Sequence, residues 1–483
     1  MPFARLYSAA FIGLEAIPVE IEVDLETKQG QVRIVGLPDA AVKESKDRVL
    51  HAVKNSGFPT DALTCMIHLA PAEIKKVGAF YDLPIALGML RGLGAFHAHD
   101  LENYLIGGEL GLYGEIRPIH GALSLSLLAK KLGKKGVLLP KANASEAALV
   151  TGLTVVPLQH LKEAIAFFKE GTIPLYTALP VQLKARPGTV DMSSIKGQVH
   201  AKRALEIAAA GNHNVLMSGP PGTGKTMLAK AFIGILPPLL FEEALEVANI
   251  YSLAGREDLM LSRPFRAPHH TISFVGMVGG GTHPKPGEIS LAHKGVLFLD
   301  ELPEFHRSTL EVLRQPLEDK EVTISRSGGK ATFPTDVICI AAMNPCPCGY
   351  LGHPEKPCKD TPSQIHRYRS KISGPLLDRI DIHLEVPPVP FQDMTSMHKE
   401  ESSEDIRQRV QAARELLRNT TPQRALNATC QALLKEATET MGISARGHQR
   451  ILKVAQTIAC LTGTSSLAEE HLLEALSYTR TYS

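Results

Sequence analysis

The stretch Gly219-Pro220-Pro221-Gly222-Thr223-Gly224-Lys225-Thr226 fits the G-x-x-x-x-G-K-[ST] pattern of a phosphate-binding loop without a mismatch. Residues 214–218 before it read as a short buried strand, and residues 227–232 after it begin a helical pattern. A strand, a glycine-rich loop and a helix in this order place backbone N–H groups around phosphate oxygens. The sequence therefore predicts a nucleotide site, for ATP or GTP.

Two side chains of this phosphate loop have predicted roles. Lys225 would hold the β- and γ-phosphates, and the hydroxyl of Thr226 would ligate Mg²⁺. The backbone around the phosphates would come from the rest of the loop: Gly219, Pro220, Pro221, Gly222, Thr223 and Gly224.

Two further strands end in polar residues suited to hydrolysis. Residues 295–299 are apolar and run into Asp300 and Glu301, where an open parallel sheet would place its ligands. We expect Asp300 to hold Mg²⁺ and Glu301 to polarise the attacking water. A third apolar run, residues 337–342, leads to Asn344, whose amide would contact both the γ-phosphate and the water.

Composition sets the outer limits. The chain has 483 residues, of which 44% are hydrophobic and 21% charged, which is ordinary for a folded protein of about three domains. Lys and Arg number 52 against 50 Asp and Glu, so any basic surface for nucleic acid must be local. Seven cysteines in so long a chain favour a reducing cytoplasm, and we expect neither a signal peptide nor a membrane anchor.

Two irregular, proline-containing stretches divide the chain. The first, 171–190, would link an N-terminal domain at 1–170 to a phosphate-loop domain at 191–390. The second starts near residue 386 and leads into a helical domain at 391–483, where apolar residues of 451–461 fall on one helix face.

The order of phosphate loop, Asp-Glu strand end and Asn resembles an AAA+ ATPase. Further motifs narrow the resemblance to magnesium-chelatase-like proteins of the YifB/ComM type over nearly the whole chain. Those motifs are residues 195–198 (IKGQ), 266–271 (RAPHHT), 286–293 (PGEISLAH), 373–381 (SGPLLDRID) and 444–448 (SARGH). The expected fold is an α/β AAA+ core with a parallel sheet, a Lon-protease-like α+β domain before it and a small helical lid after it.

The resemblance implies roles that spacing alone does not. Arg379 would act as an arginine finger on a neighbouring subunit's ATP, which implies a homo-hexameric ring, and Arg446 would be the second sensor of the lid. Ile195 and Gln198 would line the nucleotide. Without the resemblance, a surface ion pair for Arg379 and a helix-face charge for Arg446 are the simpler interpretations.

The N-terminal domain resembles a Lon-type protease domain that lacks its catalytic dyad. Such proteases pair a serine with a lysine that activates it. The corresponding stretches here are 76–82 and 118–124; the first has no serine, and Leu123 stands at the place expected for the lysine. We therefore expect binding or assembly rather than peptide hydrolysis.

A predicted β-hairpin at 321–333 carries basic residues at its tip. In the AAA+ branch that the chain resembles, a hairpin at this place points into the ring pore, where Arg326 and Lys330 would grip DNA phosphates. The insert at 263–286, with Lys285, is a candidate second pore element. A solvated turn is the alternative for the hairpin.

Three cysteines, Cys346, Cys348 and Cys358, invite a zinc interpretation, with His353, Asp360 or His366 as a fourth ligand. Reduced cysteines in a tight loop are the alternative.

Two function classes follow. The favoured one is a hexameric ATP-driven DNA motor, a helicase acting on single-stranded or branched DNA in recombination and natural transformation. The alternative is a chaperone-like ATPase for metal insertion or protein remodelling, by analogy with magnesium chelatase.

Overall fold

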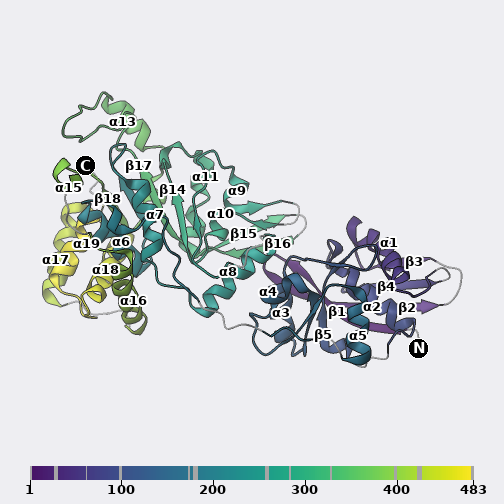
Figure 1. The fold of residues 1–483 in the computed structure, drawn as a ribbon. Helices are drawn as coiled ribbons and strands as arrows, with labels where there is room; N and C mark the ends of the chain where they lie inside the picture. Colours follow the sequence, from purple (N-terminus) through teal and green to yellow (C-terminus); the bar gives the residue numbers. More distant parts are fainter. Residues whose placement is uncertain are drawn as a thin grey trace. The chain divides into compact units, whose positions relative to one another are not determined.

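A computed structural model describes residues 3–26, 31–60, 63–96, 100–171, 174–177, 183–255, 260–281, 284–326, 329–395, 400–420 and 427–479; side chains of 326 and 329 are excluded. The chain forms two compact units (Figure 1). The first comprises Met1–Gln182, Ala248–Leu259 and Ser325–Ala331, and the second comprises Leu183–Val247, Met260–Ile324 and Thr332–Ser483. Within the described residues, no helix is long and apolar enough to cross a membrane.

The first unit is built on a mixed seven-stranded sheet in the order β3-β4-β2-β1-β5-β8-β9. Its strands are β1 (Phe3–Ile12), β2 (Glu15–Glu26), β3 (Val32–Val35), β4 (Thr64–Ala70), β5 (Tyr104–Ile106), β8 (Gly136–Pro140) and β9 (Thr154–Leu158). A two-stranded sheet joins β6 (Glu109–Leu110) to β7 (Ile116–Arg117). The helices are α1 (Ala40–Asn55), α2 (Asp82–Gly92), α3 (Ala122–Lys131), α4 (Ala144–Ala147) and α5 (Leu161–Glu170).

Helix α2 packs closely against this sheet because a glycine faces it. A Cβ added at Gly88 would lie 2.5 Å from Cγ2 of Val23 on β2. The predicted Lon-like identity of this unit stays a prediction. In the two stretches compared with the protease, Lys76 Nζ donates to the carbonyl of Pro71, and Ser124 Oγ donates to Asn249 Oδ1 at 2.5 Å. These two residues are therefore not paired with each other.

The second unit is built on a five-stranded parallel sheet in the order β11-β14-β17-β10-β18. Its strands are β10 (Val215–Ser218), β11 (Phe265–Arg266), β14 (Val296–Leu299), β17 (Ile338–Met343) and β18 (Ile382–Glu385). The three strands predicted before the phosphate loop, Asp300 and Asn344 are thus confirmed as β10, β14 and β17. They read as continuous apolar runs because their side chains are buried on both faces of the sheet.

Two short two-stranded β-ribbons lie between the core strands in the sequence. One pairs β12 (Gly279–Gly280) with β13 (Lys285–Pro286), and the other pairs β15 (Glu321–Arg326) with β16 (Gly329–Pro334). The predicted hairpin is therefore present, although its turn residues, Ser327 and Gly328, lie outside the described residues. The other α-helices between residues 199 and 377 that lie wholly in this unit are α6 (Val199–Gly211), α7 (Lys225–Ile235), α9 (Phe274–Val278), α10 (Glu288–Leu291), α11 (Arg307–Glu311), α12 (Arg314–Asp319), α13 (Pro362–Arg369) and α14 (Gly374–Leu377). Helix α8 (Phe241–Leu253) begins in the second unit and ends in the first.

The C-terminal residues form helices, as the periodicity predicts. They are α15 (Phe391–Thr395), α16 (Ser403–Asn419), α17 (Ala428–Met441), α18 (Ala445–Leu461) and α19 (Glu469–Ser477). Ser402 caps α16 by accepting the N–H of Asp405, whose carboxylate also suits the positive end of the helix dipole. Helices α16 and α18 pack on α6, so these helices belong to the same compact unit as the sheet. Ile451, Val454, Ala455 and Ile458 are buried.

Candidate functional site

The phosphate loop joins the end of β10 to the start of α7. Gly222 and Gly224 have φ values of 81° and 88°, a region that side chains with a Cβ disfavour. A Cβ added at either position would meet nothing within 4 Å, so the requirement there is conformational. At Gly219 the requirement is spatial, since a Cβ would lie 2.2 Å from the carbonyl oxygen of Val386. The loop thus has the conformation and the open face that an anion site needs.

Lys225 lies buried at the base of this loop. Its Nζ donates to the carbonyls of Gly219 at 2.7 Å and Pro220 at 2.8 Å, and to Oδ1 of Asn344 at 3.3 Å. Burial lowers the pKa of Lys225, while the nearby carboxylate of Asp300 opposes that shift. The oxygens that accept from the ammonium group are thus uncharged, and a bound phosphate would replace them with negatively charged oxygens.

Thr226 and Asp300 form the second half of the site. Thr226 Oγ1 donates to Asp300 Oδ2 at 2.8 Å, although the two residues are 74 positions apart. A hydroxyl and a carboxylate at the carboxyl edge of a parallel sheet suit Mg²⁺, which takes oxygen ligands. The residues present therefore fit the predicted ion, which when bound would neutralise charge on the phosphates.

Glu301 follows Asp300 in a left-handed backbone conformation, with φ of 52°. This conformation is uncommon outside glycine. The Glu301 side chain is 61% exposed, and its Oε2 lies 3.4 Å from Nδ1 of His270. His270 belongs to the RAPHHT motif, but no role was predicted for it from the sequence.

A cavity of about 540 Å³ opens beside Glu301 and Asn344. Arg367 near the end of helix α13 and Lys371, two residues beyond that helix, contribute to the lining. Sequence reasoning missed these two cations; the dense basic run of residues 367–371 was the available signal. The cavity brings positive charge close to the predicted hydrolysis residues.

Gln198 connects the segment before α6 to the phosphate loop. Its Nε2 donates to the carbonyl of Pro387 at 2.7 Å and to that of Thr223 at 3.4 Å. Ile195, three residues earlier, is buried in the core of the second unit. Gln198 thus lies next to the predicted nucleotide site, while Ile195 supports the segment that carries it.

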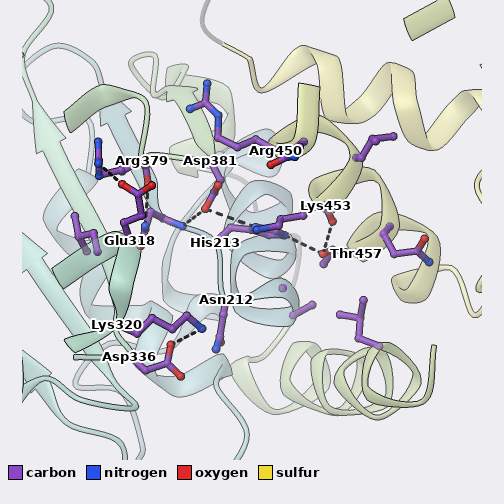
Figure 2. Close-up of a pocket in the computed structure, with 18 of the residues that line it drawn as sticks. Asn212, His213, Glu318, Lys320, Asp336, Arg379, Asp381, Arg450, Lys453 and Thr457 are labelled. Carbon is purple, nitrogen blue, oxygen red and sulfur yellow. Dashed lines mark hydrogen bonds and ion pairs between the residues drawn. The ribbon is translucent and has the colours of Figure 1, made fainter. Parts of the chain in front are cut away.

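Arg379 and Arg446 lie elsewhere, at a cavity of about 820 Å³. Figure 2 shows this cavity and labels Arg379. Its lining includes Asn214 and Val337, which precede β10 and β17. Because the strands are parallel, this is the amino edge of the sheet, opposite the edge that carries the phosphate loop. The structure therefore does not bring either arginine to its own chain's phosphate loop.

One carboxylate, Glu318 at the end of α12, pairs with both arginines. Arg379 forms an ion pair with Glu318 and also donates from Nε to the carbonyl of Arg314 at 2.7 Å. Arg446 donates from its guanidinium to Glu318 Oε1 at 2.5 Å. Both cations are thus gathered at one point of the amino edge. An ion pair for Arg379 is the simpler interpretation given above, but the shared partner Glu318 was not predicted from the sequence.

Buried polar contacts tie the lid to this edge. His213 Nε2 lies 2.8 Å from Thr457 Oγ1 on α18, and His213 Nδ1 lies 3.7 Å from Asp381 Oδ2 (Figure 2). Burial works to raise the pKa of Asp381, but His213 and the N–H of Asn214 hold it below its usual range. Arg450 of α18 donates to the carbonyl of Ile380 at 2.6 Å. The lid therefore has fixed contacts with the segment that carries Arg379.

The three predicted zinc cysteines meet in the loop between β17 and α13. Their Sγ atoms and a carboxylate oxygen of Asp360 all lie within 4.8 Å of one another. Of the three fourth ligands considered, the structure thus selects Asp360. His353 instead accepts the N–H groups of Glu355 and Lys356 through Nδ1, each at 3.1 Å, and His366 lies on α13.

The predicted DNA residues are only partly described. Lys330 on β16 and Lys285 on β13 are exposed, whereas the side chain of Arg326 lies outside the described residues. Thr323 and Thr332 approach across the hairpin, with their Oγ1 atoms 3.0 Å apart. The ribbon thus presents Lys330 to solvent, and its contact with DNA stays a prediction.

Comparison of the sequence with protein families and with known proteins shows which family the chain resembles. The family described as magnesium chelatase, subunit ChlI, matches residues 191–394, and related ChlI families match 21–143 and 400–479. The chain is 43% identical to protein YifB of Escherichia coli and 42% identical to Competence protein ComM of Haemophilus influenzae. Each alignment covers 99% of this chain and 97% of the relative. The chain therefore belongs to the magnesium-chelatase-like AAA+ ATPase family that includes YifB and ComM.

Proposed function

We propose that this protein is an ATP-driven hexameric motor that moves single-stranded or branched DNA in the cytoplasm. Family membership supports the coarser part, an AAA+ ATPase with ATP and Mg²⁺ that works as an oligomer. The observation that carries the proposed ring is the separation of Arg379 and Arg446 from the phosphate loop of their own chain. A site divided in this way needs a second copy of the chain to complete it.

In the proposed hydrolysis step, each residue of the carboxyl edge has a distinct task. Lys225 exchanges its carbonyl partners for phosphate oxygens, and Thr226 and Asp300 hold Mg²⁺. Glu301 orients the attacking water and accepts its proton. Asn344 already contacts Lys225, so a change at the γ-phosphate would reach β17 through this amide.

The amino edge would serve the neighbouring subunit. A head-to-tail contact that repeats around an axis closes into a ring, and it brings one chain's amino edge to the next chain's phosphate loop. Arg379 and Arg446 would then leave Glu318 and spread their donors over phosphate oxygens. Because the two arginines share one partner, we propose that both act on the same neighbouring ATP.

DNA is the proposed substrate because of the ribbon and one relative. Lys330 is exposed on β16, where it is available to a phosphate backbone. The Haemophilus influenzae relative is named as a competence protein, which supports a role in recombination of incoming DNA during natural transformation. The first unit would assist assembly or binding rather than cleave peptides.

The test is ATPase activity with and without single-stranded and forked DNA. We expect DNA to stimulate hydrolysis, and Lys330→Ala to reduce the stimulation but not the basal rate. Lys435→Ala is the matched control, because Lys435 is also an exposed lysine, on α17. Strand displacement on three-way and four-way junctions, with Glu301→Gln as the hydrolysis-deficient control, then tests motor activity.

The alternative is a chaperone-like ATPase that inserts metal or remodels a protein. It is favoured by the family match itself, since ChlI is described as a subunit of magnesium chelatase. Absence of DNA stimulation and of DNA binding at low salt would contradict the motor and favour this alternative. ATP hydrolysis would be retained in both cases.

A further inference from the structure

Three thiols and one carboxylate, here named the Cys-Asp cluster, occupy the loop that follows Asn344. The Sγ atom of Cys346 lies 3.4 Å from that of Cys348 and 3.6 Å from that of Cys358. The third separation, between Cys348 and Cys358, is also 3.6 Å. The three sulfur atoms therefore form a nearly equilateral triangle.

This triangle has the dimensions of a tetrahedral metal site. A Zn–S bond of about 2.3 Å places the sulfur atoms of a tetrahedron about 3.8 Å apart. With a Zn–O bond of about 2.0 Å, the oxygen lies about 3.5 Å from each sulfur. Asp360 Oδ2 lies 3.7 Å from Cys358 Sγ, close to that expectation. Thiolates with one carboxylate are ligands that suit Zn²⁺ better than Mg²⁺ or Ca²⁺.

The backbone of the loop also holds these ligands in place. Gly349, with φ of 82°, turns the chain so that its N–H donates to the carbonyl of Cys346 at 3.0 Å. The N–H of Leu351 points to Cys346 Sγ at 3.4 Å, and the N–H of Cys348 donates to Asp360 Oδ2 at 2.8 Å. Such outer contacts orient metal ligands and stabilise their negative charge.

The Cys-Asp cluster lies beside the predicted hydrolysis site. Cys346 is two residues beyond Asn344, and a Cβ added at Gly349 would lie 2.8 Å from Cδ of Pro221 in the phosphate loop. Arg369 of α13 donates to the carbonyl of Pro345 at 3.2 Å. The loop that follows Asn344 thus contacts the phosphate loop on one side and α13 on the other.

We propose that the Cys-Asp cluster binds a structural Zn²⁺ that fixes the Asn344 loop against the phosphate loop. The ligands are the thiolates of Cys346, Cys348 and Cys358 and a carboxylate oxygen of Asp360. The ion is not a participant in hydrolysis, since its four positions are filled by protein. This site does not depend on whether DNA is the substrate.

Metal content of the untagged full-length protein, purified under reducing conditions and dialysed, tests the site directly. We expect about one zinc per chain in the wild type and in the control Glu355→Gln, which changes an exposed residue of the same loop. Cys348→Ser and Asp360→Ala should bind zinc at least about tenfold more weakly in competition with a chelator. Asp360→Cys should retain zinc, which separates loss of a ligand from loss of the fold.

A second measurement follows the loop itself. After replacement by Co²⁺, the visible spectrum should show tetrahedral thiolate coordination and should shift in Asp360→Cys, where a sulfur replaces the oxygen. Zinc removal should expose the loop to protease and lower ATPase activity, and zinc addition should restore both. The proposal would be overturned by a wild-type protein that contains no zinc, or by a disulfide among these cysteines instead of a metal. It would also be overturned if Asp360→Ala and Cys348→Ser bound zinc as tightly as the wild type.

Discussion

The two edges of the parallel sheet in the second unit differ in whether the predicted ATPase residues contact one another within a single chain. At the carboxyl edge, Lys225 contacts Asn344 and Thr226 contacts Asp300 within one chain. At the amino edge, Arg379 and Arg446 both pair with Glu318, so two cations that would suit a phosphate are held by one carboxylate. On the proposed function, one chain can bind nucleotide alone, whereas hydrolysis needs the amino edge of another chain.

The largest expected effect comes from removing the Arg379 guanidinium from the amino edge. Arg379→Ala should lower kcat for ATP by about 10³-fold, the magnitude typical of an arginine finger, and should leave ATP affinity nearly unchanged. Steady-state ATPase rates and equilibrium binding of a fluorescent ATP analogue measure the two. Arg117→Ala removes an exposed ion-paired arginine of the first unit and is the control. Loss of ATP affinity would mean that Arg379 serves its own chain's site.

The matching change at the carboxyl edge is Glu301→Gln. It should lower kcat by about 10²- to 10³-fold, because the amide accepts no proton from water, while ATP binding and ATP-dependent assembly persist. Size-exclusion chromatography with ATP, alongside the ATPase rate, is the measurement. The exposed Glu439→Gln on α17 is the control. Near-normal hydrolysis in Glu301→Gln would assign the water to another residue.

Glu318→Gln should have a smaller effect that connects the two edges. In the wild type, the arginines must break their ion pairs with Glu318 before they can contact a neighbouring subunit's ATP. Glu318→Gln removes that cost, so the protein concentration that gives half-maximal ATPase activity should fall a few-fold. Titration of ATPase rate against protein concentration measures this, with the neighbouring Asp319→Asn as the control. A loss of kcat as large as that of Arg379→Ala would show instead that Glu318 positions the arginines.

The smallest effect concerns stability at the amino edge. Burial works to raise the pKa of Asp336, but Lys320 and Lys294 hold it at about 2, below its ordinary 3.8. A folded-state pKa that is depressed adds stability above the unfolded value, and that stability is lost as pH falls towards the folded value. Asp336→Asn should therefore cost about 1–2 kcal/mol of unfolding free energy at pH 7.

This cost should shrink as pH falls below about 4, where the wild-type carboxyl becomes protonated as well. Urea unfolding of both proteins between neutral and acidic pH measures the difference. A difference that does not depend on pH would assign the effect to packing. The carboxyl edge should retain ATP binding in Asp336→Asn, because Asp336 belongs to the other edge.

The sequence predicted the carboxyl edge well because its chemistry is local. The phosphate loop is contiguous, and Asp300 and Asn344 each follow an apolar strand that the structure confirms. The pairing at the amino edge was not predictable in this way. Glu318 meets residues 61 and 128 positions away, and no spacing rule selects such a partner. For the same reason the sequence left three choices for the fourth ligand of the Cys-Asp cluster.

The roles of His270, Arg367 and Lys371 were missed because neither the RAPHHT motif nor the basic run at 367–371 says which other residues these side chains approach in the fold. They gain interest only from the cavity beside Glu301 and from the contact of His270 with that carboxylate. The roles of the site residues stay predictions.

Subunit complementation tests the division of the site most directly. Lys225→Ala should not bind ATP but still offers Arg379, whereas Arg379→Ala binds ATP but offers no finger. Each variant alone should be nearly inactive. An equal mixture should regain up to about a quarter of the wild-type ATPase, because half the phosphate loops are intact and half of those adjoin an intact finger. A mixture no more active than its components, although the two variants co-assemble, would contradict the account.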